Sequence, residues 1–474
     1  MRTRRFLVMA VLAAGSLLVG TPAVAAPAGP AAPVAGATPL APVPGAEGVG
    51  DPYFPLAGNG GYDVRSYGLD LRYDPATRRL AGTAAILATA TRSLSRFDLD
   101  LRGFTVSSVT VNARRATWTR SGQELVITPA RPLRRGLPFL VTVRYAGVPQ
   151  VITDPDESIE GFVPTDDGAF VVGEPQGAPG WFPSNDHPID KATMTLRMTV
   201  PAGITAVGNG RLLAQTTRAG HTTFVWNESK PMATYLATIT LGRFDVHRTT
   251  AGRIPVYVAL DPREAAEAKP VTDRIPEVIA WEQSVFGRYP FETVGAIVDR
   301  APDVGYALES QTKPNFDSAP DIATLVHELA HQWYGDSVSL SRWQDIWLNE
   351  GFATYAEWLW SEHTGADSAQ ALFDEAYARP ATSAFWTHPA GDPGGPENLF
   401  GSPSYDRGAM TLHALRVRIG DRAFFRLLRA WAQRYRYGNV TTAQFVALAE
   451  RISRRQLDRL FDVWLYQPGK PTSW

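Results

Sequence analysis

The sequence predicts an α+β fold in which an N-terminal antiparallel β domain, a saddle or sandwich, is followed by an α-rich domain. From residue 62 to about 247, short segments rich in β-branched and aromatic residues alternate with glycine, proline and aspartate, as expected for strands joined by turns. From about residue 249 onward, the apolar residues follow helical spacing instead. The 474 residues, of which 44% are hydrophobic, are enough for two domains with their own cores.

Residues 1–26 have the pattern of a secretory signal peptide. A start that contains three arginines precedes an apolar stretch at 6–20 and the small-residue cleavage site Ala23-Val24-Ala25. The apolar stretch is too short to span a membrane, and the chain has no cysteine to carry a lipid or to form a disulfide. We therefore expect a secreted protein without stable membrane insertion.

The regions after the signal differ in composition. Residues 27–50 are rich in alanine, proline and glycine and predict a flexible linker, which places the β domain at 51–248 and the α-rich domain at 249–474. Loss of the signal's three arginines changes the formal net charge from −1 to −4. That charge argues against nucleic acid or an anionic membrane surface as a partner. The sequence carries no signal for a particular oligomeric state.

Secondary-structure elements are predicted from periodicity and from residue type. The strands expected in the β domain are 66–73, 124–128, 140–145, 192–200, 222–227 and 235–241. A further strand at 254–260 leads into the helices. These are expected at 265–286, 322–333, 344–360, 407–419, 422–435 and 442–452.

The helix at 322–333 carries the sequence His327-Glu328-Leu329-Ala330-His331. Residues four apart lie one turn apart on the same helix face, so the two histidines can bind one metal ion. Glu328 is then placed to take a proton from a water molecule at that metal. An apolar stripe on the opposite face faces the core. It consists of Ile322, Leu325, Val326, Leu329 and Trp333. The competing interpretation is a pair of ordinary surface histidines.

Glu350, in Leu348-Asn349-Glu350-Gly351, is the candidate third ligand. It shares a helix face with apolar residues such as Ile346 and Trp347, and a carboxylate in such surroundings is costly unless it is paired or binds a metal. A salt bridge would explain it equally well. As a ligand, Glu350 would leave the fourth metal position open, which distinguishes a catalytic zinc site from a structural one. We expect one Zn²⁺ per chain.

These motifs resemble the gluzincin zinc aminopeptidases of the aminopeptidase N type, over residues 62 to 466. The segments that carry the resemblance are Val207-Gly208-Asn209-Gly210, 232–237, 327–336 and 348–355. The resemblance implies a saddle-like β domain packed on a thermolysin-like catalytic domain. It also implies hydrolysis of the N-terminal residue from peptides with a free N-terminus. His327, His331 and Glu350 would bind zinc, and Glu328 would be the general base.

The same resemblance implies roles for residues outside the metal motif. Tyr405, in Ser404-Tyr405-Asp406-Arg407, would stabilise the oxyanion of the transition state. Glu309 would bind the α-amine of the substrate, with Ala307 beside it in the binding segment. Gln176, in Glu174-Pro175-Gln176, would contact the substrate from the β domain.

The sequence also departs from this family. It reads Tyr306-Ala307-Leu308-Glu309-Ser310 where relatives have Gly-Ala/Gly-Met-Glu-Asn, and it has Ala178 where many relatives have a second acidic residue. It ends at Trp474, where most relatives continue into a helical domain over the active site. These differences predict an altered pocket, weaker amine recognition and a more open cleft. A zinc endopeptidase is therefore the alternative function. An inactive peptide-binding module is disfavoured because the set of catalytic residues is complete.

Overall fold

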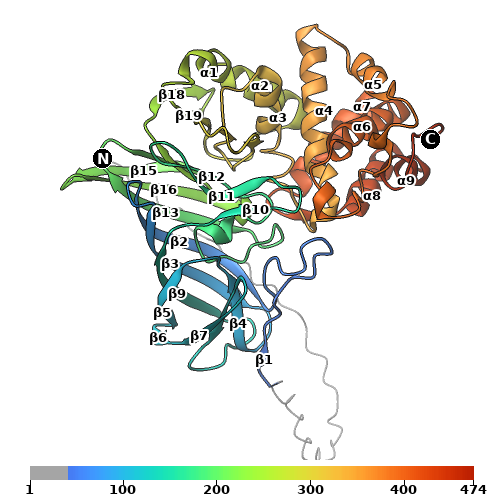
Figure 1. Cartoon of the computed structure of the whole chain (residues 1–474). Coiled ribbons are helices and arrows are strands. Elements are labelled where there is room, and N and C mark those ends of the chain that lie inside the picture. Colours follow the sequence, from blue (N-terminus) through green and yellow to red (C-terminus); the bar gives the residue numbers. More distant parts are fainter. Residues whose placement is uncertain (1–40) are drawn as a thin grey trace, which may run out of the picture. The chain divides into compact units, whose positions relative to one another are not determined.

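The computed structural model describes residues 41–474, which form one compact unit. The predicted signal peptide at 1–26 and the predicted linker up to residue 40 lie outside the described residues. Within the described residues, a β-rich part precedes a mostly helical part (Figure 1). The predicted α+β order of the domains is confirmed.

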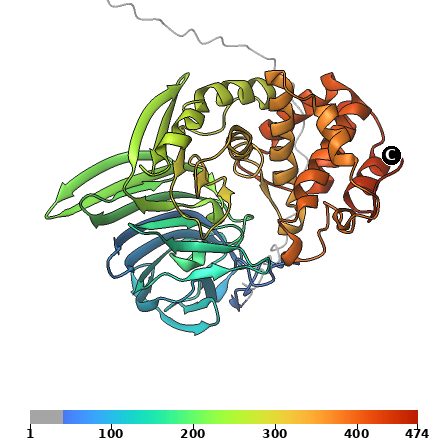
Figure 2. The ribbon, with the colours of Figure 1, turned by 45° about the horizontal axis from the view of Figure 1, so that its top comes forward.

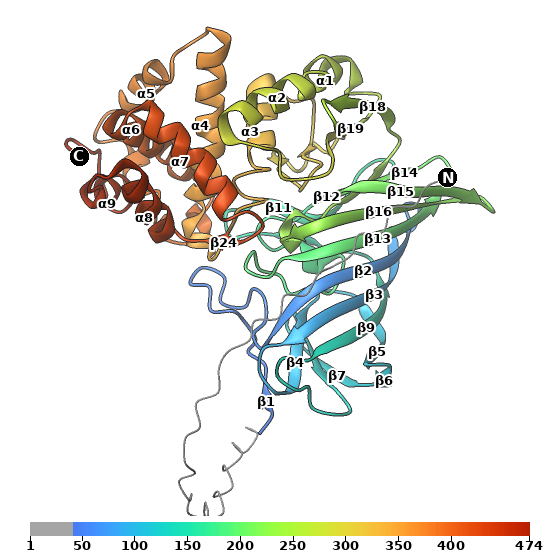
Figure 3. The ribbon, with the colours of Figure 1, turned by 180° about the vertical axis from the view of Figure 1, so that it is seen from behind.

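An eight-stranded sheet forms most of the first part, and its strands lie side by side in Figure 3. The strand order is β15 (Arg211–Arg218), β16 (His221–Met232), β13 (Ala192–Pro201), β2 (Tyr62–Asp74), β3 (Arg79–Ala90), β9 (Pro138–Gly147), β5 (Thr105–Val111) and β6 (Arg114–Arg115). The sheet is mixed, not purely antiparallel as predicted, because β13 runs parallel to β2. These strands are far apart in sequence, so no hairpin turn requires them to be antiparallel.

Two smaller sheets complete the β domain. One has the order β1 (Val43–Pro44), β4 (Leu94–Asp100), β8 (Glu124–Thr128) and β7 (Thr117–Ser121). The other has the order β10 (Val151–Thr153), β11 (Ile159–Pro164), β12 (Ala169–Val172), β17 (Ile239–Gly242) and β14 (Thr205–Gly208). Strand β1 falls inside the predicted linker. The composition of that segment did not reveal that its backbone pairs with β4.

The predicted strand 235–241 is only partly a strand. A 3-10 turn at Thr234–Leu236 precedes β17. Asn209 explains the interruption, because its side-chain amide donates to the carbonyl of Leu236 at 2.9 Å and accepts from the amide of Thr238 at 2.8 Å. The same amide group donates to the carbonyl of Gln311 at 2.8 Å and so ties the β domain to the second domain.

The second domain begins with a five-stranded sheet. Its order is β18 (Asp245–Ala251), β19 (Ile254–Leu260), β20 (Val294–Val298), β22 (Asn315–Phe316) and β21 (Ala307–Leu308). The predicted domain boundary at 248/249 therefore falls inside β18. A further short pair joins β23 (Ser339–Leu340) and β24 (Asn439–Val440).

The helices of the second domain extend to the end of the chain. They are α1 (Ala265–Thr272), α2 (Ile275–Phe286), α3 (Ile322–Ala330), α4 (Trp347–Thr364), α5 (Ala369–Tyr377), α6 (Gly408–Ile419), α7 (Asp421–Arg434), α8 (Thr442–Ser453) and α9 (Asp458–Leu465). Figure 2 shows the helices from α4 onward, coloured orange to red, gathered on one side. Helices α5 and α9 were not predicted.

The predicted helix 265–286 is two helices, α1 and α2. Pro276 lies in the first turn of α2. A proline provides no backbone N–H, and none is needed in the first turn of a helix. Pro276 is therefore compatible with the start of α2 at Ile275, but proline alone does not explain the break, because α1 contains Pro270.

Helix α4 is the central element of the helical part and packs on both α3 and α6. The contact with α6 is close because two glycines meet there. A Cβ atom added to Gly351 would lie 2.8 Å from the Cα atom of Gly408. This contact fixes the helix that carries Glu350 against the start of α6, directly after the segment that contains Tyr405. Within residues 41–474, no helix is long and apolar enough to cross a membrane.

Candidate functional site

Helix α3 presents the two predicted metal-binding histidines. The carboxylate of Asp321 caps its N-terminus by accepting from the amide of Thr324 at 2.8 Å. Leu325, Val326 and Leu329 are fully buried in the core, which orients the opposite side of the helix toward α4. The helix ends at Ala330, so His331 lies in the turn that follows it.

The side chains of His327, His331 and Glu350 converge on one point. One ligand atom from each residue lies within 4.8 Å of the other two. The Nε2 atoms of His327 and His331 lie 3.3 and 3.5 Å from the same Glu350 oxygen, Oε2. Two imidazole nitrogens and one carboxylate oxygen are the donor set of catalytic zinc sites, which leave a further position open. The three residues therefore fit a zinc ion.

The outer nitrogen of each histidine is held by a second group. The Nδ1 atom of His327 bonds to Glu357 Oε1 at 2.6 Å, and that of His331 bonds to the carbonyl of Tyr334 at 3.0 Å. Such partners fix the ring so that Nε2 faces the metal. Glu357 is not among the site residues predicted from the sequence. Its position seven residues after Glu350 places it on the same face of α4, and this spacing was a usable signal.

A cavity of about 250 Å³ contains the metal-binding atoms. Its lining residues are Glu174, Tyr306, Ala307, Glu309, Thr324, His327, Glu328, His331, Glu350, Glu357 and Tyr405. We call this the catalytic cavity. The predicted site residues Glu328, Tyr405, Glu309 and Ala307 all line it, as do the three metal ligands. Their individual roles stay predictions.

Gln176 does not line the catalytic cavity. Its backbone N–H donates to the carboxylate of Glu160 at 3.0 and 3.2 Å. The β domain contributes Glu174 to the cavity instead. The substrate contact predicted for Gln176 stays a prediction. Glu174 therefore supplies the second carboxylate that seemed to be missing at Ala178.

The segment that carries Glu309 is fixed from both domains. The side chain of Gln332 donates to the carbonyl of Glu309 at 2.9 Å and accepts from the amide of Thr312 at 2.7 Å. From the β domain, the amide of Gly210 donates to the Thr312 hydroxyl at 2.7 Å. Gln332 directly follows His331, so the candidate amine-binding group and a metal ligand share one support.

Tyr405 lies in a π-helical turn, Pro403–Arg407, that leads into α6. Its ring lies over that of His327, with the centroids 6.0 Å apart and the planes at 22°. Arg407 holds this turn, because its buried guanidinium donates to the carbonyls of Trp464 at 2.8 Å and Val463 at 3.1 Å on α9. Burial, followed by the charge of Glu350, raises the pKa of Tyr405 well above its usual value. The hydroxyl therefore remains a hydrogen-bond donor.

The carboxylates around the catalytic cavity have unequal tendencies to ionise. Burial raises the pKa of Glu174, Glu309 and Glu328, that of Glu328 to about 8. Burial opposes ionisation of Glu350 too, but the nearby imidazoles, His331 first, lower its pKa to about 2. One oxygen each of Glu174, Glu309 and Glu328 has no hydrogen-bond partner among the residues that the structure describes. These unpaired oxygens favour a cation in the cavity.

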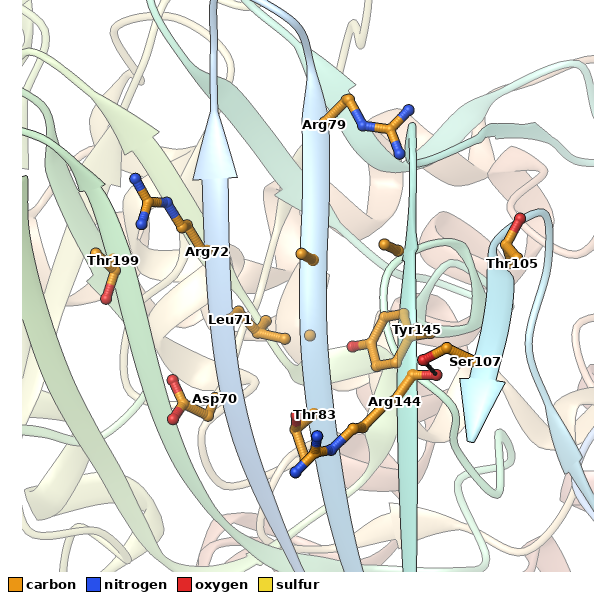
Figure 4. Close-up of a pocket in the computed structure, with 13 residues that line it drawn as sticks. Asp70, Leu71, Arg72, Arg79, Thr83, Thr105, Ser107, Arg144, Tyr145 and Thr199 are labelled. Atoms are coloured by element: carbon orange, nitrogen blue, oxygen red, sulfur yellow. Dashed lines mark hydrogen bonds between the residues drawn. The ribbon is translucent and has the colours of Figure 1, made fainter. Parts of the chain in front are cut away.

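A second cavity lies far from these residues, on the eight-stranded sheet. It has a volume of about 600 Å³ and shares no lining residue with the catalytic cavity. Figure 4 shows Arg72, Arg79 and Arg144 around it on neighbouring strands. It contains no cluster of metal-binding side chains, and we assign it no part in the site.

Replacement of Glu357 by alanine should weaken zinc binding without removing a ligand. The His327 ring would lose the partner that orients it, and loss of such a group typically costs roughly ten- to a hundredfold in metal affinity. Competition with a chromogenic chelator measures this affinity. Glu375→Ala, at an exposed position on α5, is the matched control. An unchanged affinity in Glu357→Ala would show that Glu357 does not support the metal site.

Comparisons with known proteins agree with this site. Residues 63–236 match the model of the peptidase M1 N-terminal domain, and residues 292–464 match that of the peptidase family M1 domain. The structure of an M1 zinc metallopeptidase from Deinococcus radiodurans is similar, with a TM-score of 0.83 and 32% identity over 90% of this chain and 99% of that one. A mutant of that protein has been solved with a Tyr-Ser-Ala substrate.

Two curated relatives are aminopeptidases. The human glutamyl aminopeptidase is 30% identical over 63% of this chain and 34% of its own length. The probable aminopeptidase 2 of Sulfurisphaera tokodaii is 27% identical over 61% of this chain and 40% of its own length. The matches thus span well under half of these relatives. Both domain models and the full-length structural match lead to one conclusion: the chain belongs to the M1 family of zinc metallopeptidases.

Proposed function

We propose that this protein is a zinc aminopeptidase that removes the N-terminal residue from peptides. This proposal rests mainly on the residues that line the catalytic cavity. It combines three metal-binding side chains, the Glu328 carboxyl group beside them and two further carboxyl groups that form no ion pair with a lysine or arginine of the described residues. The aminopeptidase relatives and the Tyr-Ser-Ala complex of the Deinococcus radiodurans protein support the choice of substrate.

The hydrolytic step depends on Glu328. Zinc held by His327, His331 and Glu350 would polarise the scissile carbonyl and lower the pKa of a water molecule. Glu328 accepts a proton from the attacking water and passes it to the amine that leaves. Its unpartnered oxygen Oε2 is free for this contact. Tyr405 donates its hydroxyl proton in a hydrogen bond to the carbonyl oxygen as negative charge develops there.

Substrate orientation depends on Glu309 and Glu174. In the described part of the chain, each has a carboxylate oxygen without a hydrogen-bond partner, and the two residues come from different domains. A protonated α-amine between them would form charge-assisted hydrogen bonds. Binding the amine at this end of the cavity places the first peptide bond, and not a later one, at the metal. This restriction makes the enzyme an exopeptidase.

Glu328→Gln should separate metal binding from catalysis. Glutamine keeps the shape of the side chain but is not a base, so zinc content should persist while kcat falls by roughly 10²- to 10⁴-fold. His327→Ala, in contrast, should lose the metal. Metal analysis and turnover of an aminoacyl reporter measure both effects, with Glu375→Gln as the charge-matched control. Turnover near that of the wild type in Glu328→Gln would contradict the mechanism.

Tyr405→Phe should act on the transition state. The substitution removes one hydrogen-bond donor and leaves the ring in place, so kcat should fall on the order of a hundred- to a thousandfold. The KM should change much less, because the bond is strong only in the transition state. Tyr435→Phe, at a partly buried position just after α7, is the control. A raised KM with intact kcat would instead make Tyr405 a substrate-binding residue.

We also propose that the protein is secreted. The proposal rests on the sequence of residues 1–26, in which the arginine-rich start, the apolar stretch and the cleavage site occur in the required order. The mature chain should begin at about Ala26 or Pro27. N-terminal sequencing of the protein from culture medium measures this start, and recovery of Met1 would contradict the proposal.

A further inference from the structure

A further cavity opens from the catalytic cavity. It has a volume of about 440 Å³ and is lined by Asp156, Glu157, Ser158, Glu174, Val304, Gly305, Tyr306, Ala307, Phe400 and Tyr405. Four of these residues, Glu174, Tyr306, Ala307 and Tyr405, also line the catalytic cavity. The two spaces are therefore neighbours. We call the larger one the side-chain cavity.

The walls of the side-chain cavity come from four parts of the chain. The loop between β10 and β11 contributes Asp156 and Glu157, and Glu174 follows β12. The segment before β21 contributes Tyr306, and Phe400 precedes the turn of Tyr405. Two walls are joined, because the hydroxyl of Tyr306 donates to the carbonyl of Ile159 at 3.0 Å. Tyr306 and Phe400 give the cavity aromatic surfaces.

The charged side chains that line this cavity are all acidic. Asp156, Glu157 and Glu174 are its ionisable carboxyl groups, and no lysine, arginine or histidine lines it. The carboxylate of Asp156 accepts only from the backbone and hydroxyl of Ser158, within its own loop. In the part of the chain that the structure describes, none of the three carboxylates forms an ion pair with a basic residue. Their negative charge is therefore available to bind a cationic ligand.

Glu174 is an independent indication of a cationic ligand. The residue is 8% exposed, and within residues 41–474 its Oε1 atom has no hydrogen-bond partner. The electrostatic potential in this region is also negative. Burial raises the pKa of Tyr306 well above its usual value, and Glu160, Asp154, Glu174 and Asp156 raise it further. A buried carboxylate and a negative field both favour a positive group in the cavity.

We propose that the side-chain cavity receives the side chain of the substrate's first residue and selects lysine and arginine. This inference rests on the proposed aminopeptidase function. The carbon atom next to the bound α-amine carries that side chain, and Glu174 lines both the catalytic cavity and the side-chain cavity. The long apolar stem packs on Tyr306 and Phe400, and its cationic end reaches Asp156 and Glu157. An acidic side chain is repelled from the same walls.

The test compares aminoacyl reporters of arginine, lysine, leucine and glutamate. The kcat/KM for arginine and lysine should exceed that for leucine by at least roughly tenfold, with glutamate lowest. In Asp156→Asn/Glu157→Gln the arginine-to-leucine ratio should fall by about tenfold or more. Asp367→Asn/Glu375→Gln removes two exposed charges from the helical part and should leave the ratio unchanged. Equal ratios in the wild type and in Asp156→Asn/Glu157→Gln would overturn the assignment.

A binding measurement separates this inference from the proposed function. Calorimetry with zinc-loaded Glu328→Gln should give tighter binding of L-argininamide than of L-leucinamide, and added salt should reduce the difference. If no reporter were hydrolysed but this preference were found, the aminopeptidase function would fail and the cavity's selectivity would stand. If reporters were hydrolysed but the two amides bound equally, the selectivity would fail and the aminopeptidase function would stand.

Discussion

Burial of carboxylate groups that no lysine or arginine of the described residues pairs is the constraint on which the active site depends. Glu174, Glu309, Glu328 and Glu350 all line the catalytic cavity, and each is buried. Such groups are costly in a folded protein unless a cation compensates them. A zinc ion would compensate the carboxylates near the histidines, and in the proposed function the substrate's α-amine compensates Glu174 and Glu309. The same physical requirement thus explains both the cofactor and the substrate.

The constraint also explains why the site is built across two domains. Helices α3 and α4 bring the metal ligands together, while the β domain supplies Glu174. The relative positions are maintained by buried polar contacts, in which Asn209 and Gly210 bond to the segment that follows Glu309. Lys191 of the β domain adds a further tie, donating to the carbonyl of Asp336 at 2.7 Å. Without the β domain, the catalytic cavity would lose the carboxyl group of Glu174.

The sequence predicted those parts of the fold and site that depend on local spacing. His327, Glu328 and His331 were found because helical periodicity fixes their geometry, and the edges of most helices follow from the same rule. Glu174 was missed because its position depends on how β12 ends beside the second domain. The strand predicted at 235–241 is interrupted because Asn209 bonds to its backbone, and this tertiary contact cannot be predicted from local sequence. The pairing of β1 with β4 cannot be predicted from composition either.

The proposed aminopeptidase function is tested most directly by comparing one peptide in two forms, with a free N-terminus and with an acetylated N-terminus. The measurement identifies the products that the enzyme releases from each form. A protonated amine held by buried carboxylates is worth roughly 1.5–3 kcal/mol. Mass spectrometry should therefore find only the first residue released from the free peptide, and cleavage of the acetylated peptide should be at least roughly tenfold slower. Internal cleavage of both peptides at equal rates would contradict the account and identify an endopeptidase.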